Sequence, residues 1–269
     1  MIIATLGPEG TFSHEAVIKY DKKAKIIFEG TIRDVFETVG DKKADLGIVP
    51  IENSIAGTVG QTLDYLMKFK LKIRAEEILP IGHNLVGFGK IEDIKILYLH
   101  PQTYEQCELF IKKSLPKVEI IQTSSNGKSA EVISKSKVKT NASIIPKLAV
   151  DIYKLKILKK DVQDNRFNVT RFFVISKEDE KKTGYDRTSI AVYPQVDRPG
   201  LLHDMLGQFA KRKINLTKIE SRPSKGKLGD YIFFIDFQGH KSEKHVGEAL
   251  KNIEDSSFVT VLGSYPRKY

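Results

Sequence analysis

Residues 1–176 alternate between short continuous apolar runs and segments in which apolar residues recur at helical spacing. Short apolar runs bounded by turn residues are typical of buried strands, whereas a spacing of three to four residues is typical of helices. The expected strands are Ile2–Leu6, Lys25–Phe28, Asp45–Val49, Ile94–Leu99, Val118–Gln122, Ala142–Ile145 and Arg171–Ile175. The expected helices are Ser13–Tyr20, Thr31–Thr38, Gln61–Phe69, Thr103–Lys113, Lys128–Ser134 and Pro146–Tyr153. This repeated alternation predicts α/β lobes with mainly parallel sheets.

A polar, charged and Gly-terminated segment, Ser176–Gly184, interrupts this pattern and is typical of a linker. After it, the order of expected elements changes to βαββαβ, the split βαβ or ferredoxin-like pattern. These elements are a strand at Thr188–Tyr193, a helix at Pro199–Lys211, strands at Asn215–Ser221 and Tyr231–Phe237, a helix at Ser242–Ile253 and a strand at Val259–Ser264. We therefore expect two α/β lobes in residues 1–178, a linker at 179–186 and a smaller domain at 187–269.

Composition and charge limit the classes of function. The chain has 269 residues, 41% of them hydrophobic, which is usual for a globular protein. Its net charge of +10 would suit a nucleic-acid partner, but the Lys pairs are spread along the chain, which favours a solvated surface. The apolar runs, such as Tyr231–Ile235, are too short to cross a bilayer, and the N-terminus is expected to be a strand rather than a signal peptide. Because Cys107 is the single cysteine, we expect no disulfide within the chain and no cysteine metal site. Together with the charge pattern and the short apolar runs, this predicts a cytoplasmic protein without nucleic-acid or membrane partners.

Two turns at the ends of expected strands carry polar residues. The turn Gly7–Ser13 precedes a helix and either cradles an anion or is a structural βα turn; its spacing differs from the dinucleotide fingerprint. Glu52, Asn53 and Ser54 follow a buried strand, at the end where open α/β sheets bind ligands. They offer an acceptor, an amide and a hydroxyl. The alternative is a turn or helix-capping pair beside a solvated acid.

Two further segments carry candidate site residues. In His100–Cys107, His100 is either a base or a structural hydrogen-bonding residue, and we expect Cys107 to be packed rather than nucleophilic. Thr170 and Arg171 would alternate faces in an extended strand, so they need not meet one ligand. Arg171 either holds a carboxylate or pairs with a surface acid.

Four segments resemble, in order, the signatures of the prephenate dehydratase family: Gly7–Glu15 (GPEGTFSHE), Val49–Val59 (VPIENSIAGTV), His100–Cys107 (HPQTYEQC) and Asn168–Phe172 (NVTRF). Asn215–Pro223 (NLTKIESRP) resembles the phenylalanine-responsive ACT domain attached to that family. The resemblance implies a catalytic domain like a type 2 periplasmic-binding protein, with the active cleft between two lobes. It also implies prephenate as the substrate, L-phenylalanine as the effector, a homodimer or homotetramer, and no cofactor or metal.

The resemblance also implies roles for individual residues. The catalytic residues would be Thr170, Glu52 and Asn53, with Thr170 matching the family's essential threonine. The substrate-binding residues would be Thr11, Ser13, Ser54, Gln102, Ser125, Arg171 and Phe172. The effector-binding residues would be Asp197, Gly200, Leu201, Leu202, Asn215, Leu216, Glu220, Ser221, Arg222 and Pro223, although Arg222 taken alone is expected to be an ordinary edge residue. One departure is Asn126, which stands where the family usually has threonine.

The chemistry of prephenate suggests what these residues would do. Loss of CO2 and hydroxide creates an aromatic ring, so the barrier is the departure of hydroxide, a poor leaving group. A donor aimed at that oxygen would lower the barrier, and Thr170 is expected to be that donor. If Arg171 reaches the cleft, it should bind the pyruvyl carboxylate, since holding the ring carboxylate would oppose its departure.

Three alternatives remain. A non-catalytic two-lobed binding protein is opposed by the absence of a secretion signal, and a transcription regulator by the absence of a helix-turn-helix. An acyl- or phospho-transferase is opposed by the absence of a G-x-S-x-G elbow or phosphate loop.

Overall fold

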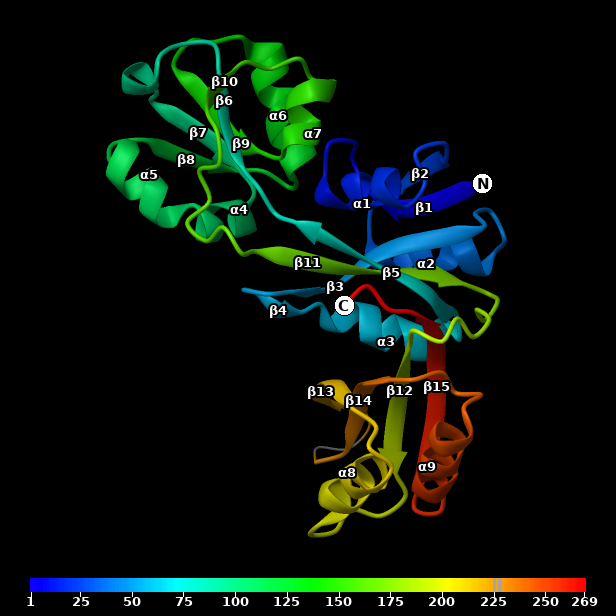
Figure 1. The fold of residues 1–269 in the computed structure, drawn as a ribbon. Helices are drawn as coiled ribbons and strands as arrows, with labels where there is room; N and C mark the ends of the chain where they lie inside the picture. The colour runs from blue at the N-terminus through cyan, green and yellow to red at the C-terminus, as the bar shows by residue number, and fades with distance from the viewer. Residues whose placement is uncertain (225, 227–228) are drawn as a thin grey trace.

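The computed structural model describes residues 1–224, 226 and 229–269, which form two α/β lobes and a C-terminal domain (Figure 1). Lobe 1 contains a mixed sheet in the order β2-β1-β3-β11-β5. Its strands are β1 (Ile2–Leu6), β2 (Lys25–Glu29), β3 (Leu46–Asn53), β5 (Lys72–Pro80) and β11 (Val169–Ser176), and the short β4 (Gly57–Thr58) pairs with β3. Helices α1 (Phe12–Tyr20), α2 (Ile32–Gly40) and α3 (Gly60–Phe69) cover the sheet.

Lobe 2 is inserted between β5 and β11, so the chain crosses from one lobe to the other twice. Its sheet has the order β10-β6-β9-β7-β8. The strands are β6 (Asn84–Gly87), β7 (Ile96–Leu99), β8 (Glu119–Gln122), β9 (Asn141–Ile145) and β10 (Ile157–Lys159). The helices are the 3-10 turn η1 (Ile91–Asp93), α4 (Pro101–Gln106), α5 (Glu108–Ser114), α6 (Asn126–Ser136) and α7 (Lys147–Ile152).

The C-terminal domain has the βαββαβ order that the sequence predicts. Its elements are β12 (Asp186–Pro194), α8 (Leu201–Lys211), β13 (Leu216–Pro223), β14 (Tyr231–Gln238), α9 (Lys244–Glu254) and β15 (Ser257–Pro266). The antiparallel sheet has the order β13-β14-β12-β15, and both helices pack on one of its faces (Figure 1). The expected ferredoxin-like fold is therefore confirmed.

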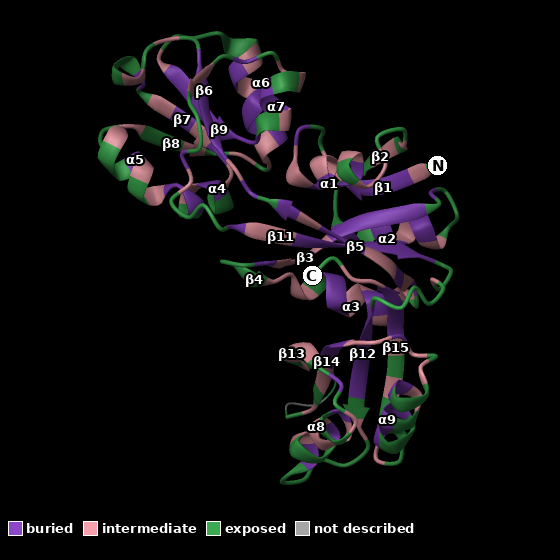
Figure 2. Cartoon of the chain, in the orientation of Figure 1, coloured by how far each residue is buried: buried purple, intermediate pink, exposed green. Residues whose placement is uncertain are grey.

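Local sequence explains where helix α2 begins. Thr31 caps α2 in a reciprocal box with Asp34, which satisfies free N–H groups at the start of that helix. Buried residues line the strands and the inner faces of the helices (Figure 2). One buried cluster continues from lobe 1 into the C-terminal domain, where Phe173 of β11 packs edge-on against Tyr265 of β15. Lobe 1 and the C-terminal domain therefore share an apolar interface.

Three sequence predictions need correction. The sheets of both lobes are mixed rather than mainly parallel, because β11 runs antiparallel to β3 and β5, and β6 runs antiparallel to β9. The helix expected at Thr103–Lys113 is interrupted at Cys107, whose backbone leaves the helical conformation. Strand β3 continues to Asn53 and so includes two residues that were expected to follow it.

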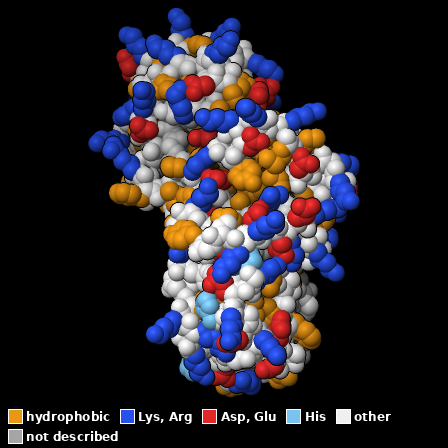
Figure 3. Space-filling model, turned by 45° about the vertical axis from the view of Figure 1, so that its right-hand side comes forward, with side chains coloured by type: hydrophobic (Ala, Val, Ile, Leu, Met, Phe, Trp, Pro, Cys, Tyr) orange, Lys and Arg blue, Asp and Glu red, His pale blue; other side chains and the backbone are white. Residues whose placement is uncertain are grey.

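The surface agrees with a scattered positive charge. Lys and Arg side chains are distributed over the visible face with acidic residues among them (Figure 3). Among the described residues, no helix has the length and apolar character to span a bilayer, and no cluster of three or more His, Cys, Asp or Glu side chains is placed to hold a metal ion.

Candidate active site

A cavity of about 360 Å³ lies between the two lobes. This is within the range of roughly 300–1,000 Å³ that is usual for small-molecule sites. Lobe 1 contributes the turn before α1, β3 and β11, and lobe 2 contributes the starts of α4 and α6. The lining residues are Leu6, Gly7, Thr11, Phe12, Ser13, Gly30, Pro50, Asn53, Val59, His100, Gln102, Ser124, Ser125, Asn126, Thr170 and Phe172.

Capped helix starts reach the cavity from both lobes. The Thr11 hydroxyl caps α1 by accepting a hydrogen bond from the His14 backbone N–H (3.2 Å), and the Ser125 hydroxyl caps α6 in the same way from Lys128 (3.0 Å). Helix N-termini favour anions because their N–H groups are free and the helix dipole is positive there. Lys and Arg are absent from the described lining. A dianionic ligand would therefore be held by helix ends and neutral donors.

Asn53 and Thr170 meet at the floor of the cavity. They are directly opposite each other in the β3–β11 pairing. The Asn53 side-chain amide donates a hydrogen bond to Thr170 Oγ1 (2.9 Å) and another to Asn168 Oδ1 (2.7 Å). Asn53 Oδ1 accepts from the backbone N–H groups of Ile55 and Ala56. The position of the Thr170 hydroxyl is thus set by a buried amide.

The neighbours of these two residues face the other way. Because side chains alternate along a strand, Glu52 and Arg171 point to the C-terminal domain when Asn53 and Thr170 line the cavity. The Arg171 guanidinium is 5% exposed and donates to Glu76 (2.7 Å), Asp236 (2.6 Å) and the Tyr265 hydroxyl (2.9 Å). Burial opposes its charge, but Tyr265, Asp236 and Glu76 outweigh that cost and raise the pKa of Arg171.

This arrangement corrects the expectations for three site residues, Arg171, Glu52 and Ser54, which lie outside the described lining of the cavity. Arg171 is not among the residues that line the cavity, and each of its three guanidinium nitrogens donates to a buried partner, so it is not placed to bind a substrate carboxylate. Glu52 pairs with Lys218 of β13 (3.4 Å) rather than facing the cavity. The Ser54 hydroxyl, which also lies outside the described lining, accepts a hydrogen bond from the Val169 N–H and joins the ends of β3 and β11.

The remaining predicted substrate residues (Thr11, Ser13, Gln102, Ser125 and Phe172) do line the cavity. His100 lines it too and caps α4 by accepting from the Gln102 backbone N–H (3.3 Å), so it has the structural role that its sequence position allowed. Burial lowers the pKa of His100, with an opposing effect from Glu105. Cys107 is fully buried and burial raises the pKa of its thiol, which fits a packed side chain.

Sequence reasoning left three contributors without a role. Phe12 and Asn126 line the cavity, and the Asn126 side-chain carbonyl accepts from the Thr103 hydroxyl (2.7 Å). Asn168 is buried behind Thr170 and accepts from Asn53. Both Phe12 and Asn168 fall inside segments that resemble family signatures, and this resemblance is the feature of the sequence that could have identified them as site residues.

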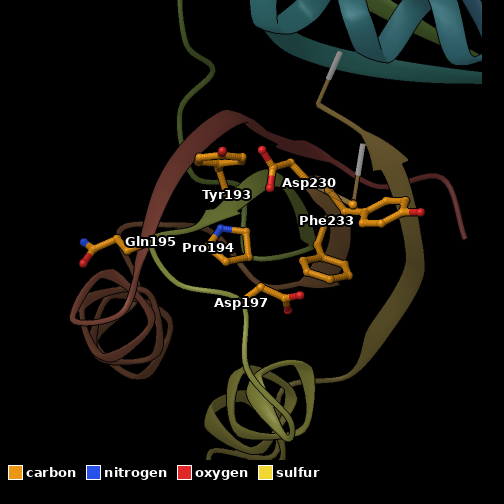
Figure 4. Close-up of a pocket in the computed structure, with 8 residues that line it drawn as sticks. Tyr193, Pro194, Gln195, Asp197, Asp230 and Phe233 are labelled. Carbon is orange, nitrogen blue, oxygen red and sulfur yellow. The ribbon is translucent and has the colours of Figure 1, made fainter. Parts of the chain in front are cut away.

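The predicted effector residues lie in the C-terminal domain, and several of them are exposed. Gly200 stands exposed at the start of α8, whereas Leu201 is buried in the domain core. Ser221 and Pro223 are exposed on β13, and Arg222 reaches across to Asp64 of α3 (3.2 Å). Arg222 is therefore an interdomain contact, not an ordinary edge residue. A small hollow of about 100 Å³ beside these segments includes Asp197, Tyr193 and Phe233 (Figure 4).

The fold and the interlobe cavity define a two-lobed α/β protein with a ligand cleft and an attached ferredoxin-like domain. The family model for prephenate dehydratase matches residues 3–180, and that for the ACT domain matches residues 195–255. The chain belongs to the prephenate dehydratase family.

Individual relatives and solved structures align with nearly the whole chain. The chain is 42% identical to the prephenate dehydratase of Methanocaldococcus jannaschii, over 98% of this chain and 97% of the relative. The solved structure of prephenate dehydratase from Arthrobacter aurescens in complex with L-Phe is 34% identical, with a TM-score of 0.91, over 99% of this chain and 90% of that one. A structure described as GqqA, a novel type of quorum-quenching acylase, is 25% identical, with a TM-score of 0.89, over 100% of this chain and 98% of that one.

Proposed function

We propose that the chain converts prephenate to phenylpyruvate, CO2 and water in the interlobe cavity, as a step of L-phenylalanine biosynthesis under feedback inhibition by L-phenylalanine. The observation that carries the catalytic part is the Thr170 hydroxyl, which is held by Asn53 at a cavity with capped helix starts on both sides. A cytoplasmic location belongs to the proposal, since the single cysteine forms no disulfide within the chain.

The proposed mechanism uses electrostatic placement rather than a strong acid. Thr170 donates a hydrogen bond to the ring hydroxyl as that oxygen gains negative charge, which lowers the barrier to its departure; the hydroxide that leaves takes a proton from the solvent and becomes water. The helix starts at Thr11 and Ser125 bind the carboxylates through backbone N–H groups. Of these two helix starts, we propose that the one nearer the pyruvyl carboxylate provides most of the carboxylate binding. Strong binding of the ring carboxylate would stabilise the group that must leave as CO2.

The test of this proposal is a direct assay. Purified protein is incubated with prephenate, without metal or nucleotide and with a chelator, and phenylpyruvate is measured. We expect turnover that the chelator does not change. Activity that needs an added metal or NAD, or hydrolysis of an acyl substrate in place of prephenate turnover, would contradict the proposal.

The regulatory part is supported by contacts between β13 and lobe 1. Lys218 of β13 donates to Thr58 (2.7 Å) and pairs with Glu52, the neighbour of Asn53 on β3. Arg222 of the same strand bonds the Asp64 carboxylate through two nitrogens (3.2 and 3.3 Å). A ligand that shifts β13 would therefore act on the strand that carries Asn53. We propose that L-phenylalanine does so, with a coupling of roughly 1–3 kcal/mol.

We further propose that the effector site is completed by a second copy of the chain in a homodimer or homotetramer. Asp197, Gly200, Asn215 and Ser221 are exposed, and β13 is an edge strand of the described sheet. An exposed edge is a surface on which another chain can pair. Sedimentation velocity with and without L-phenylalanine tests this, and a monomer under both conditions would refute it.

A further inference from the structure

The hydrogen bonds around Asn53 determine which way its amide points. Its Oδ1 accepts from two backbone N–H groups, of Ile55 (3.0 Å) and Ala56 (2.9 Å). Turning the amide over would place N–H against N–H at both positions. The two hydrogens of Nδ2 are therefore directed to the two shorter contacts, Asn168 Oδ1 (2.7 Å) and Thr170 Oγ1 (2.9 Å), while the Val169 carbonyl lies farther away (3.2 Å).

This orientation also determines the role of the Thr170 hydroxyl. A threonine hydroxyl has one hydrogen to donate and two lone pairs to accept with. Since Asn53 donates to the oxygen, the hydroxyl hydrogen must point elsewhere. Among the described residues the hydrogen-bond partner of this hydroxyl is Asn53, and Thr170 lines the cavity. The free hydrogen is thus available to a ligand there.

We propose that Asn53 is a positioning residue that keeps Thr170 a hydrogen-bond donor, with Asn168 as the buried anchor of the Asn53 amide. The inference rests on the proposed dehydratase activity and deepens it. Asn168 is 1% exposed, and its own Nδ2 has no hydrogen-bond partner among the described residues. The useful atom of Asn168 is therefore its carbonyl oxygen, which accepts from Asn53.

The variant Asn53→Asp tests this role with little change of shape. Its carboxylate still accepts from Ile55 and Ala56, but the second oxygen replaces the donor that faces Thr170. The Thr170 hydrogen would then turn to that oxygen and be lost to the ligand. The unpartnered Asn168 amide can rotate to give the new carboxylate a donor, which favours folding of the variant. We expect kcat to fall about 10²-fold with a small change in KM, the scale of losing one aimed donor.

A double-mutant cycle separates positioning from general damage. If Asn53 acts through Thr170, Asn53→Asp should lower kcat by less than about threefold in a Thr170→Ala background. The same large loss in both backgrounds would overturn the inference, as would a single variant with wild-type kcat. Asn141→Asp is the matched control, because Asn141 is a buried Asn at the start of β9 and outside the cavity lining. It should leave kcat near the wild-type value.

The pH profile gives a further readout. Protonation of the carboxylate introduced by Asn53→Asp restores a donor toward Thr170, so kcat of this variant relative to wild type should rise as the pH is lowered, after subtraction of the uncatalysed rate. His100 lines the same cavity and Glu52 adjoins Asn53, with Arg171 and Lys218 beside it, but all four are present in both proteins. A flat ratio of kcat across pH would count against the inference.

A second variant covers the case in which Asn53→Asp does not fold. Asn168→Ala removes the anchor but leaves the backbone contacts of Asn53, so we expect a smaller loss of kcat that disappears in the Thr170→Ala background. Equal loss in both backgrounds would again refute the positioning role. If wild-type protein forms no phenylpyruvate, the proposed function fails. If it does form phenylpyruvate but the loss of kcat from each variant is the same with and without Thr170→Ala, the function stands and this inference fails.

Discussion

Adjacent residues of β3 and β11 face different parts of the molecule. Asn53 and Thr170 line the cavity, whereas Glu52 and Arg171 face the C-terminal domain. The two faces share one strand pair, so a change in the position of Arg171 moves the backbone of Thr170 as well. The arginine in the Thr170–Phe172 segment is thus part of the domain interface.

We predict that Arg171→Met destabilises the protein rather than weakening substrate binding. The substitution leaves Glu76 and Asp236 as buried acids without this partner, a loss of about 3–5 kcal/mol. Urea unfolding measures the stability, and steady-state kinetics at low temperature measure KM. A KM raised tenfold at unchanged stability would instead identify Arg171 as a carboxylate clamp.

Thr170→Ala should lower kcat by roughly 10²-fold or more with little effect on KM, because one donor aimed at developing charge is lost. Thr170→Ser should retain more activity, since it keeps the hydroxyl. Both variants need equal far-UV circular dichroism to the wild type for the comparison. An alanine variant with near wild-type kcat would leave Thr170 with only a structural role.

At the scale of elements, the start of α6 is packed against the turn before α1. Gly127 faces this turn so closely that a Cβ atom there would overlap the Glu9 carbonyl oxygen and crowd Pro8. The two lobes therefore touch beside the cavity, and the contact depends on the missing side chain of Gly127.

We predict that Gly127→Ala forces the lobes apart and raises KM for prephenate by roughly tenfold, since about 1.4 kcal/mol of lost binding corresponds to that factor. The control is Gly207→Ala in α8, where nothing lies within 4 Å of the added carbon. Small-angle scattering shows whether the lobes of the variant have moved apart. An unchanged KM would mean that α6 shifts to accommodate the methyl group.

Most elements could be predicted from their own residues, and the failures have physical causes. Thr31 with Asp34 identifies the start of α2 from local capping chemistry alone. Strand β5 has no clean alternation because it is buried against both β11 and the C-terminal domain, and its Glu76 is an acid in a core position. The partners of Glu76 lie far away in the sequence, on β11 and β12, so no local pattern could reveal them.

The site shows the same limit. The segments that line the cavity were identified from their turns and their resemblance to a family. The direction in which the Glu52 and Asn53 side chains point depends on where β3 ends. Because β3 extends to Asn53, these two side chains lie on opposite faces of the strand. Likewise, the buried partners of Arg171 come from β5, β14 and β15, and their approach is a property of the assembled domains.

For the whole molecule, we predict that Gly200→Val abolishes inhibition by L-phenylalanine while uninhibited kcat stays nearly intact. Gly200 has a φ of 82° at the start of α8, a conformation that valine resists, so the free N–H groups at this helix start would be displaced. Equilibrium dialysis with labelled phenylalanine measures binding. Gly184→Val is the control, because Gly184 also has positive φ (91°) but lies in the connecting segment. Equal phenylalanine binding by wild type and Gly200→Val would remove this helix start from the effector site.

The insertion of lobe 2 between β5 and β11 has a consequence for the order of folding. During synthesis, β11 emerges only after all of lobe 2, yet it lies between β3 and β5 in the lobe 1 sheet. Until then β5 has no neighbour to join it to the β2-β1-β3 half, whereas lobe 2 is continuous in sequence and can form first. The strand that carries Thr170 is thus the one that closes the lobe 1 sheet, so the Thr170 hydroxyl reaches its place in the interlobe cavity only after both lobes have been synthesised.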